Sequence, residues 1–199
     1  KIMVKRVIDI LGSGLGLVIL SPVFLWVALK IKLDDGGPIF YKGRRVGKGG
    51  KLFEMYKFRT MVIGADKLGG PSTAADDPRL TGIGLFLKKY QLDELPQLIN
   101  VFKGKMSLVG PRPEVEMYVD MMTIEQKNAI LSVRPGMTDY ASLWNFHESE
   151  ILKGAKDPEI AYQKLIRPKK LALQMRYVKE CSLWVDIKII FLTIFKIFK

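Results

Sequence analysis

A nearly unbroken apolar run from Val7 to Leu29 limits what this chain of 199 residues can fold into. As an α-helix the run would be about 34 Å long, which is enough to cross the hydrocarbon core of a bilayer. A signal peptide is a poor alternative, because the run is long, Asp9 lies inside it and no small-residue cleavage pattern follows. Hydropathy alone therefore favours a plain transmembrane helix.

Two features of this run argue against a full crossing. The dipeptide Ser21-Pro22 interrupts it, and a proline removes one helical hydrogen bond and clashes with the carbonyl four residues earlier. We therefore predict a kink at which the Ser21 hydroxyl satisfies the freed carbonyl. Basic residues also flank both ends, so the positive-inside rule places both ends in the cytoplasm. They are Lys1, Lys5 and Arg6 before the run, and Lys30, Lys32, Lys42, Arg44 and Arg45 after it. The sequence predicts a re-entrant helix, which enters the membrane, turns and leaves on the same face.

Polar and small residues inside the run need separate explanations. We expect Asp9 to pair with Lys5 or Arg6, one helical turn away, near the lipid headgroups. Three glycines at residues 12, 14 and 16 do not form a dinucleotide-binding loop, because no strand precedes them and the glycine at the last position of that motif is absent. We expect them to permit close helix packing or lipid contact.

The net charge of +12 implies an anionic partner, which can be nucleic acid, a phosphorylated substrate or an acidic membrane surface. Nucleic acid is disfavoured, because no helix-turn-helix, zinc finger or aromatic RNA-binding pattern is present and the basic residues flank apolar runs. The single cysteine, Cys181, excludes an internal disulfide and fits a reducing compartment. The single histidine, His147, argues against a His/Cys zinc site.

The middle of the chain has sequence patterns typical of both strands and helices, and most of them are helical. Residues 38–41 and 51–56 flank a Gly/Lys turn and predict a β-hairpin, with Lys57 and Arg59 on one side if the second strand continues. Residues 64–81 have a loop composition and residues 85–92 predict a short helix. Further helices are expected from the capping box Thr123-x-x-Gln126 to near Arg134, from Asp157-Pro158-Glu159, and from Pro168 with Leu171, Met175 and Val178 on one face.

The C-terminal stretch from Trp184 to Lys199 is dense in large apolar residues, with Lys188 and Lys196 between them. It can be a core helix or a helix in the membrane interface, and its place at the end of the chain favours the interface. We predict an α+β, mainly helical fold in three parts. These are a re-entrant membrane helix with its flanks (1–33), a cytosolic catalytic domain containing the hairpin (34–181) and an amphipathic interfacial helix (182–199).

The stretch Leu92-Asp93-Glu94-Leu95-Pro96-Gln97-Leu98 predicts the start of a short helix that Gly104 ends. Asp93 is expected as the N-cap, with Glu94 in the first turn. Two acids at a helix start are ordinary capping residues, but that end of a helix also keeps a carboxylate ionised and attracts phosphate.

Close behind this stretch, Met106-Ser107-Leu108-Val109-Gly110-Pro111-Arg112-Pro113 places an arginine between two prolines. The prolines stiffen the backbone on both sides of Arg112, which suits a guanidinium that must meet a phosphate in a fixed orientation. Together the two motifs resemble the bacterial sugar transferase family, the monotopic phosphoglycosyl transferases of the small type. Family-like stretches also occur at residues 56–61, 77–81, 134–138 and 182–188, so the resemblance covers nearly the whole chain.

The resemblance implies an enzyme that transfers a sugar-1-phosphate from a UDP-sugar to a polyprenol phosphate such as undecaprenyl phosphate and releases UMP. It would start the synthesis of a membrane glycoconjugate or polysaccharide. Asp93 is then the nucleophile that forms an aspartyl-phosphosugar intermediate, and Glu94 is its partner. Mg²⁺ is the expected ion, held by Asp93 with Glu94 as a second candidate ligand. Membrane lipids are further partners, and the implied location is the cytoplasmic face of the bacterial inner membrane, with the protein inserted from one side only.

Arg112 is assigned to substrate phosphate. Lys57, Arg59, Arg79 and Arg134 are assigned to phosphate or uridine contacts, although each alone is equally consistent with a solvated or salt-bridged role. The sequence departs from the family at Lys88 and Lys89, where an arginine is common, and at Gln91, where a serine is common. Lys88 can supply charge to a phosphate but no bidentate fork. Residues 139–147 also diverge, and we expect them to shape the sugar pocket.

Two further functions compete with this reading. A non-catalytic membrane scaffold with the same fold would release no nucleotide from any UDP-sugar. A glycosyltransferase that moves only the sugar would release UDP in place of UMP.

Overall fold

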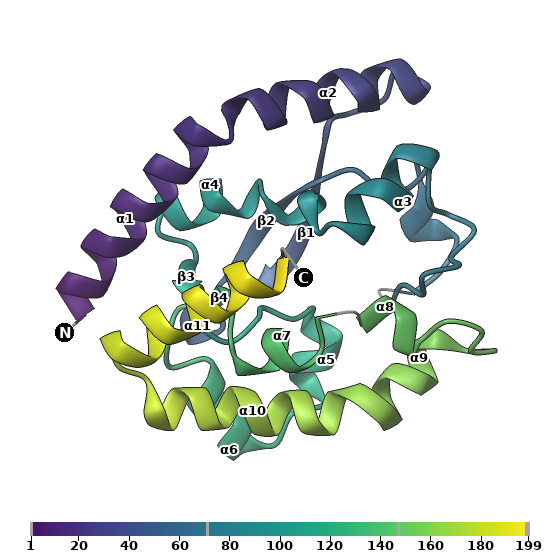
Figure 1. Ribbon diagram of the computed structural model, residues 1–199. Helices are drawn as coiled ribbons and strands as arrows, with labels where there is room; N and C mark the ends of the chain where they lie inside the picture. The colour runs from purple at the N-terminus through teal and green to yellow at the C-terminus, as the bar shows by residue number, and fades with distance from the viewer. Residues whose placement is uncertain (1, 71, 147, 198–199) are drawn as a thin grey trace.

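Helices make up most of the chain in the computed structural model, which describes residues 2–70, 72–146 and 148–197 (Figure 1). Lys1, His147 and Lys199, which the sequence analysis singled out, lie outside the described residues. The N-terminal helices and strands, up to the Asp93 region, are α1 (Ile2–Ile19), α2 (Ser21–Asp35), β1 (Phe40–Val46), β2 (Leu52–Phe58) and α3 (Gly82–Lys89). The same part of the chain contains the 3-10 turns η1 (Lys48–Gly50), η2 (Ala65–Lys67) and η3 (Leu92–Glu94). The rest of the first two-thirds are α4 (Gln97–Phe102), β3 (Ser107–Val109), α5 (Glu116–Asp120), α6 (Ile124–Ile130) and β4 (Gly136–Thr138). The last elements are α7 (Tyr140–Trp144), α8 (Glu148–Ile151), α9 (Pro158–Ala161), the π-helical turn η4 (Tyr162–Ile166), α10 (Arg167–Glu180) and α11 (Leu183–Ile197).

The first two helices form one bent rod along a side of the molecule (Figure 1). The bend between them is 59°, and Pro22 stands in the first turn of α2. The Ser21 hydroxyl donates a 2.7 Å hydrogen bond to the carbonyl of Val18, the group that a proline at position 22 cannot reach with an N–H. The predicted kink and the predicted role of Ser21 are both confirmed. Among the described residues, no single helix has the length and hydropathy of a membrane span, and α1 and α2 reach them only as a bent pair.

Asp9 does not pair with Lys5 or Arg6, so that expectation is wrong. Its side chain is only 2% exposed and accepts hydrogen bonds from the Ser107 hydroxyl at 3.0 Å and the Leu108 N–H at 2.9 Å. Lys5 instead pairs with Asp186, and Arg6 donates to carbonyl oxygens at the end of α4. A buried carboxylate requires strong donors, and β3 supplies them where the helix surface cannot. Asp9 therefore fastens α1 to β3.

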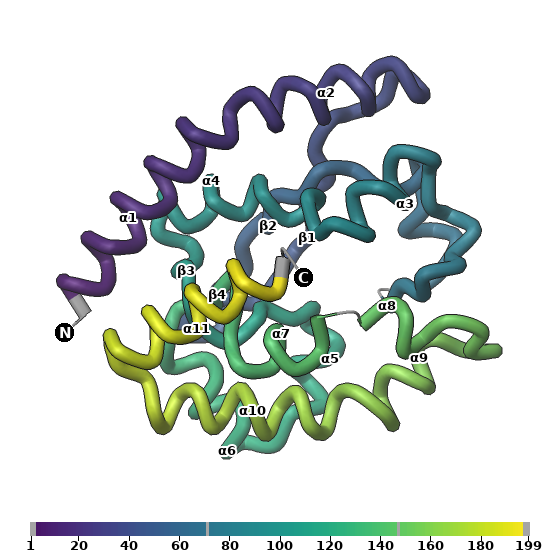
Figure 2. The backbone as a smooth tube through the Cα atoms, viewed as in Figure 1, coloured from purple at the N-terminus to yellow at the C-terminus, as the bar shows by residue number. Residues whose placement is uncertain are grey.

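The glycines of α1 lie on the side of the helix that packs on α4 and β3. Figure 2 shows α1 running beside α4. A Cβ atom added to Gly12 would lie 2.8 Å from Leu108, and one added to Gly16 would lie 3.2 Å from Leu98. The expectation of close helix packing is therefore confirmed at Gly16, which meets α4, whereas Gly12 packs against β3.

Two small sheets connect the helices. β1 and β2 form the predicted antiparallel hairpin, with Phe40 opposite Phe58 and Val46 opposite Leu52. β3 and β4 pair in parallel, with Ser107 opposite Gly136. β2 ends at Phe58, so the strand does not continue to Arg59 and the shared face predicted for Lys57 and Arg59 is not formed.

Several helix starts follow the sequence prediction. Thr123 and Gln126 form the complete capping box of α6, and Asp157 caps α9. α6 ends at Ile130, several residues before the predicted end near Arg134. In α10, Leu171 is buried, and together with Met175 it packs on the core that contains Val119 and Ile130.

The last helix, α11, buries one side and exposes the other. Asp186 and Ile189 face the interior, where α11 lies over β3 and β4 (Figure 2). Trp184 is 80% exposed and Phe191 is 62% exposed. Large apolar side chains are exposed along the bent rod as well, at Met3, Val4, Val7, Leu11, Leu15, Val18, Ile19, Leu25, Leu29 and Leu33. Exposed apolar area of this extent marks a surface that contacts membrane or another protein.

We predict that Asp9→Ala destabilises the protein by about 2–3 kcal/mol, because it leaves the buried donors of Ser107 and Leu108 without their charged acceptor. Denaturant unfolding in detergent would measure the change. The matched control is Asp34→Ala, which removes an exposed carboxylate and should shift stability by less than about 0.5 kcal/mol. Equal stability of the two variants would contradict the anchoring role of Asp9.

Candidate active site

The two acids of the central motif lie in the 3-10 turn η3, directly before α4. The prediction that Asp93 is the N-cap is wrong, because Pro96 holds the N-cap position of α4 and no side chain caps that helix. The chain is wound more tightly here, with Glu94 N–H donating to the Gln91 carbonyl at 3.3 Å and Leu95 N–H donating to the Leu92 carbonyl at 3.2 Å. The predicted end is confirmed: Gly104 follows α4 with φ of 77° and donates to the Val101 carbonyl at 2.9 Å.

Glu94 is paired with two cations from other parts of the chain. Lys57, in β2, lies 2.9 Å from Glu94 Oε1 and 3.7 Å from Asp93 Oδ2. Arg112, between its two prolines, pairs with the same Oε1 atom through Nη2. The Arg112 Nη1 atom also donates to the Met137 carbonyl at 3.2 Å, which fixes the plane of the guanidinium. The three charged side chains therefore hold one another in place beside Asp93.

The two carboxylates respond differently to this environment. Asp93 is 6% exposed, and burial raises its pKa above the ordinary value, against the pull of the nearby Lys57 charge. Burial alone would also raise the pKa of Glu94, but the charges of Arg112 and Lys57 outweigh burial and hold that pKa well below its usual range. Glu94 is therefore the permanently ionised partner, and Asp93 is a carboxylate that is poorly hydrated and surrounded by positive charge.

Lys88 lies in the last turn of α3, near this pair of acids. Burial lowers the pKa of Lys88 to about 8, and the neighbouring Lys57 charge acts in the same direction. The charge of Lys88 is thus only partly retained at mildly alkaline pH.

The fold brings together five of the predicted catalytic and binding residues, which are Lys57, Lys88, Asp93, Glu94 and Arg112. The three others, Arg59, Arg79 and Arg134, bond to protein groups outside this cluster. Arg59 pairs with Asp35 and donates to the Pro38 carbonyl at 2.7 Å. Arg134 donates to the Gly104 carbonyl at 3.1 Å. Among the described residues, neither side chain is bonded to Asp93 or Glu94.

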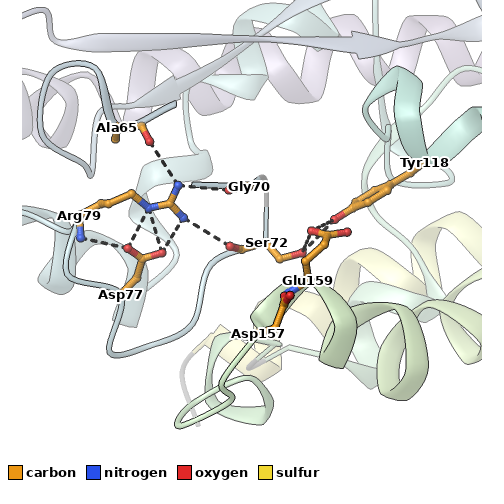
Figure 3. Close-up of polar contacts among 8 residues, drawn as sticks. All are labelled: Ala65, Gly70, Ser72, Asp77, Arg79, Tyr118, Asp157 and Glu159. Carbon is orange, nitrogen blue, oxygen red and sulfur yellow. Dashed lines mark hydrogen bonds and ion pairs between the residues drawn. The ribbon is translucent and has the colours of Figure 1, made fainter. Parts of the chain in front are cut away.

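Arg79 organises the loop of residues 64–81 (Figure 3). Its guanidinium pairs with Asp77 at 2.7 Å and donates to carbonyl oxygens of the same loop, those of Ala65, Gly70 and Ser72. The Ser72 hydroxyl in turn bonds Tyr118 and Glu159, both at 2.9 Å. These contacts give Arg79 a structural role, and its assignment to substrate, like those of Arg59 and Arg134, stays a prediction.

The sequence analysis did not identify two polar side chains that hold the segments of the site in place. The Gln174 amide in α10 donates to the Arg112 carbonyl at 3.2 Å. The buried Asn100 side chain joins α4 to β2, accepting from Tyr56 N–H at 2.9 Å and donating to the Glu54 carbonyl at 2.7 Å. The available signal for Gln174 is its place on the apolar face that Leu171, Met175 and Val178 form, whereas Asn100 lies off the apolar face predicted for its helix. In the segment of residues 139–147, Asp139 caps α7 by accepting from Ser142 N–H at 2.7 Å.

Comparison with known proteins identifies the family. The family model described as bacterial sugar transferase matches residues 1–199. This chain belongs to the bacterial sugar transferase family. The resemblance seen in the two motifs is thereby confirmed over the whole chain.

Curated relatives cover the same region. The UDP-glucose:undecaprenyl-phosphate glucose-1-phosphate transferase of Escherichia coli strain K12 is 38% identical over 198 residues, which are 98% of this chain and 40% of the relative. The exopolysaccharide production protein ExoY of Rhizobium meliloti is 35% identical over 209 residues, 96% of this chain and 84% of the relative. A putative undecaprenyl-phosphate N-acetylgalactosaminyl 1-phosphate transferase of Bacillus subtilis is 46% identical over 117 residues, 59% of this chain and 65% of that protein. The chain spans well under half the length of the first of these relatives.

We predict that UDP binds to this site about tenfold more weakly at pH 9 than at pH 7, because Lys88 loses its positive charge as the pH rises through about 8. Lys88→Arg should remove this loss of affinity, since a guanidinium stays charged over the whole range. Calorimetric titration with UDP at a series of pH values measures the effect. Lys89→Arg, a change at the exposed neighbour, should keep the wild-type pH profile. A wild-type affinity that does not change between pH 7 and 9 would exclude a contact between Lys88 and the phosphates.

Proposed function

We propose that this chain is the catalytic region of a phosphoglycosyl transferase, which moves a sugar-1-phosphate from a UDP-sugar to a polyprenol phosphate and releases UMP. Two kinds of evidence support the proposal. The family and the undecaprenyl-phosphate transferases among its relatives give the reaction class. The observation that carries the mechanism is a buried aspartate next to a glutamate that Lys57 and Arg112 hold ionised.

In the first step, a carboxylate oxygen of Asp93 attacks the sugar-bearing phosphorus of the UDP-sugar. A bond forms between Asp93 and that phosphorus, and the bond from phosphorus to the bridging oxygen breaks, so that UMP leaves with the electron pair. In the second step, a phosphate oxygen of the polyprenol phosphate attacks the same phosphorus. The acyl–phosphate bond breaks, the Asp93 carboxylate is restored and the product is a polyprenol diphosphate-linked sugar.

The main obstacle to both steps is charge, because an anionic nucleophile approaches a phosphate that is already negative. Phosphoryl transfer depends mostly on positioning and on electrostatic stabilisation of this charge. Lys57, Lys88 and Arg112 supply three positive charges around two carboxylates. Arg112 is held by Met137 and Glu94, so its fork is oriented before a phosphate arrives.

Magnesium fits this site only as an ion shared with substrate. The described residues contain no group of three or more histidine, cysteine, aspartate or glutamate side chains able to hold a metal. Mg²⁺ commonly takes one or two carboxylates and completes its coordination with substrate phosphates and water. Asp93 and Glu94 would be those carboxylates, and both ion pairs of Glu94 use Oε1 rather than Oε2. The ion would neutralise charge on the diphosphate when bound.

The surface of the protein supports a membrane location. The bent α1–α2 pair and the outer face of α11 expose large apolar side chains, and basic residues flank the apolar run at both ends. We infer that the pair enters the cytoplasmic leaflet of the bacterial inner membrane and returns, while α11 lies in the interface. A polyprenol phosphate keeps its headgroup at that surface, where Asp93 can reach it.

Asp93→Asn should lower UMP release by about 1,000-fold or more, because an amide oxygen is a far weaker nucleophile than a carboxylate. Membrane binding and the unfolding temperature should stay close to wild type. Asp120→Asn, which changes a carboxylate that is 80% exposed, is the matched control and should keep full activity. A luminescence assay for UMP with a panel of UDP-sugars measures the effect. Release of UDP in place of UMP would favour transfer of the sugar alone, and no nucleotide release with any donor would favour a scaffold.

The re-entrant arrangement predicts that both ends of the bent pair lie on one side of the membrane. In a Cys181→Ser background, Met3→Cys and Asp34→Cys should react equally with a membrane-impermeant maleimide added to the cytoplasmic side of sealed vesicles. Val18→Cys, beside the bend, should be protected until detergent is added. Labelling of Met3→Cys and Asp34→Cys from opposite sides would show a full crossing and contradict the proposal.

A further inference from the structure

Gln91, directly before the 3-10 turn that carries Asp93 and Glu94, has an unusual backbone conformation. Its φ is 53°, in the left-handed region, and it is the one non-glycine residue with a positive φ in the part of the chain that the structure describes. Glycine adopts this conformation without steric cost, whereas a side chain with a Cβ does not. Strained backbone of this kind clusters at functional sites. A glutamine at this position therefore calls for a reason beyond the turn itself.

The backbone of Gln91 closes the turn that carries the two acids. Its N–H donates to the Lys88 carbonyl at 3.2 Å, and its carbonyl accepts the Glu94 N–H at 3.3 Å. The residue thus joins the end of α3 to η3. Any shift of Gln91 moves Asp93 and Glu94 with it.

The side chain of Gln91 reaches a segment 55 residues away. Its Nε2 atom donates a 2.5 Å hydrogen bond to the carbonyl of Phe146. Because the acceptor is a main-chain atom, the bond ties the Gln91 side chain to the backbone at residue 146. Glycine has no side chain to make this contact, so the contact explains why a glutamine stands at position 91.

The segment that receives this bond is itself held in place. Lys196 of α11 donates to the Leu143 carbonyl and lies 5.5 Å from the centre of the Phe146 ring. Asn145 is 9% exposed and donates to Glu148 at 2.8 Å. Residues 143–146 are therefore a fixed wall, and the length of the Gln91 side chain sets the distance from this wall to the acids.

We propose that Gln91 is a positioning residue, which holds the Asp93–Glu94 turn at a set distance from the wall of residues 143–146 and so aligns Asp93 with the donor phosphate. The inference rests on the proposed function. Gln91 itself touches no reacting atom and acts through the backbone of Glu94 and Phe146. A misplaced nucleophile should slow the chemical step more than it weakens donor binding.

Two variants separate this role from that of a simple turn former. Gln91→Gly keeps the left-handed turn without strain and removes the bond to Phe146. Gln91→Glu keeps the size of the side chain but replaces the donor with a carboxylate that faces a carbonyl oxygen. We expect kcat for UMP release to fall about tenfold or more in both. The KM for the UDP-sugar should change by less than about threefold, and the unfolding temperature of Gln91→Gly should equal or exceed that of wild type.

The matched control is Gln163→Ala, which removes a glutamine amide that bonds Glu159 at 3.2 Å, and it should keep wild-type kcat. Wild-type kcat in Gln91→Gly would overturn the inference, as would activity that falls only in proportion to the folded fraction. If the wild-type chain releases no UMP with any donor, the proposed function fails, and amide hydrogen exchange then decides the positioning role. Exchange at Glu94 should be faster in Gln91→Gly than in wild type, and unchanged exchange would overturn the inference.

Discussion

The pairing of one glutamate with two cations is the interaction on which the rest of this site depends. Glu94 joins Lys57 from the hairpin and Arg112 from the loop after β3, so it brings two distant segments to Asp93. Removing charges from water is costly, and breaking such a pair leaves a charge buried without its partner. The same arrangement leaves Asp93 poorly hydrated and close to three positive side chains. That combination suits an anion that must attack another anion.

The outer helices are joined to this site through buried polar contacts. Asp9 binds β3 from α1, while Lys5 of α1 pairs with Asp186 of α11 at 2.5 Å and donates to the Val109 carbonyl at 3.0 Å. The Tyr177 hydroxyl of α10 also donates to Asp186, at 2.7 Å. β3 leads directly into the Pro111–Pro113 loop that presents Arg112. The helices with exposed apolar faces and the Pro111–Pro113 loop that carries Arg112 therefore form one connected structure.

Local signals in the sequence were sufficient to predict the structure where a single residue type determines the backbone conformation. Pro22 and Ser21 gave the kink, Thr123 and Gln126 gave the capping box, and the Gly/Lys turn gave the hairpin. Partners far apart in the chain were not predictable in this way. Asp9 has basic residues one turn away and yet binds β3, because burial selects the strongest donors in three dimensions. The sequence predicts Asp93 as a helix cap, but Pro96 holds that position and Asp93 lies in the 3-10 turn before it. Motif resemblance predicted Lys57, Lys88 and Arg112 as site residues, whereas the contacts of Gln91 and Asn100 with main-chain groups leave no pattern in one sequence.

A covalent bond between Asp93 and a sugar-bearing phosphate is the central feature of the proposed mechanism. Rapid mixing of the protein with a radiolabelled UDP-sugar, without polyprenol phosphate, followed by acid quench and peptide mass spectrometry, tests it directly. We expect a sugar-phosphate adduct on the peptide that contains Asp93, formed together with one equivalent of UMP and lost when polyprenol phosphate is added. UMP release that occurs only after polyprenol phosphate is added, with no adduct on the protein at any time, would show direct transfer between the substrates and contradict the account.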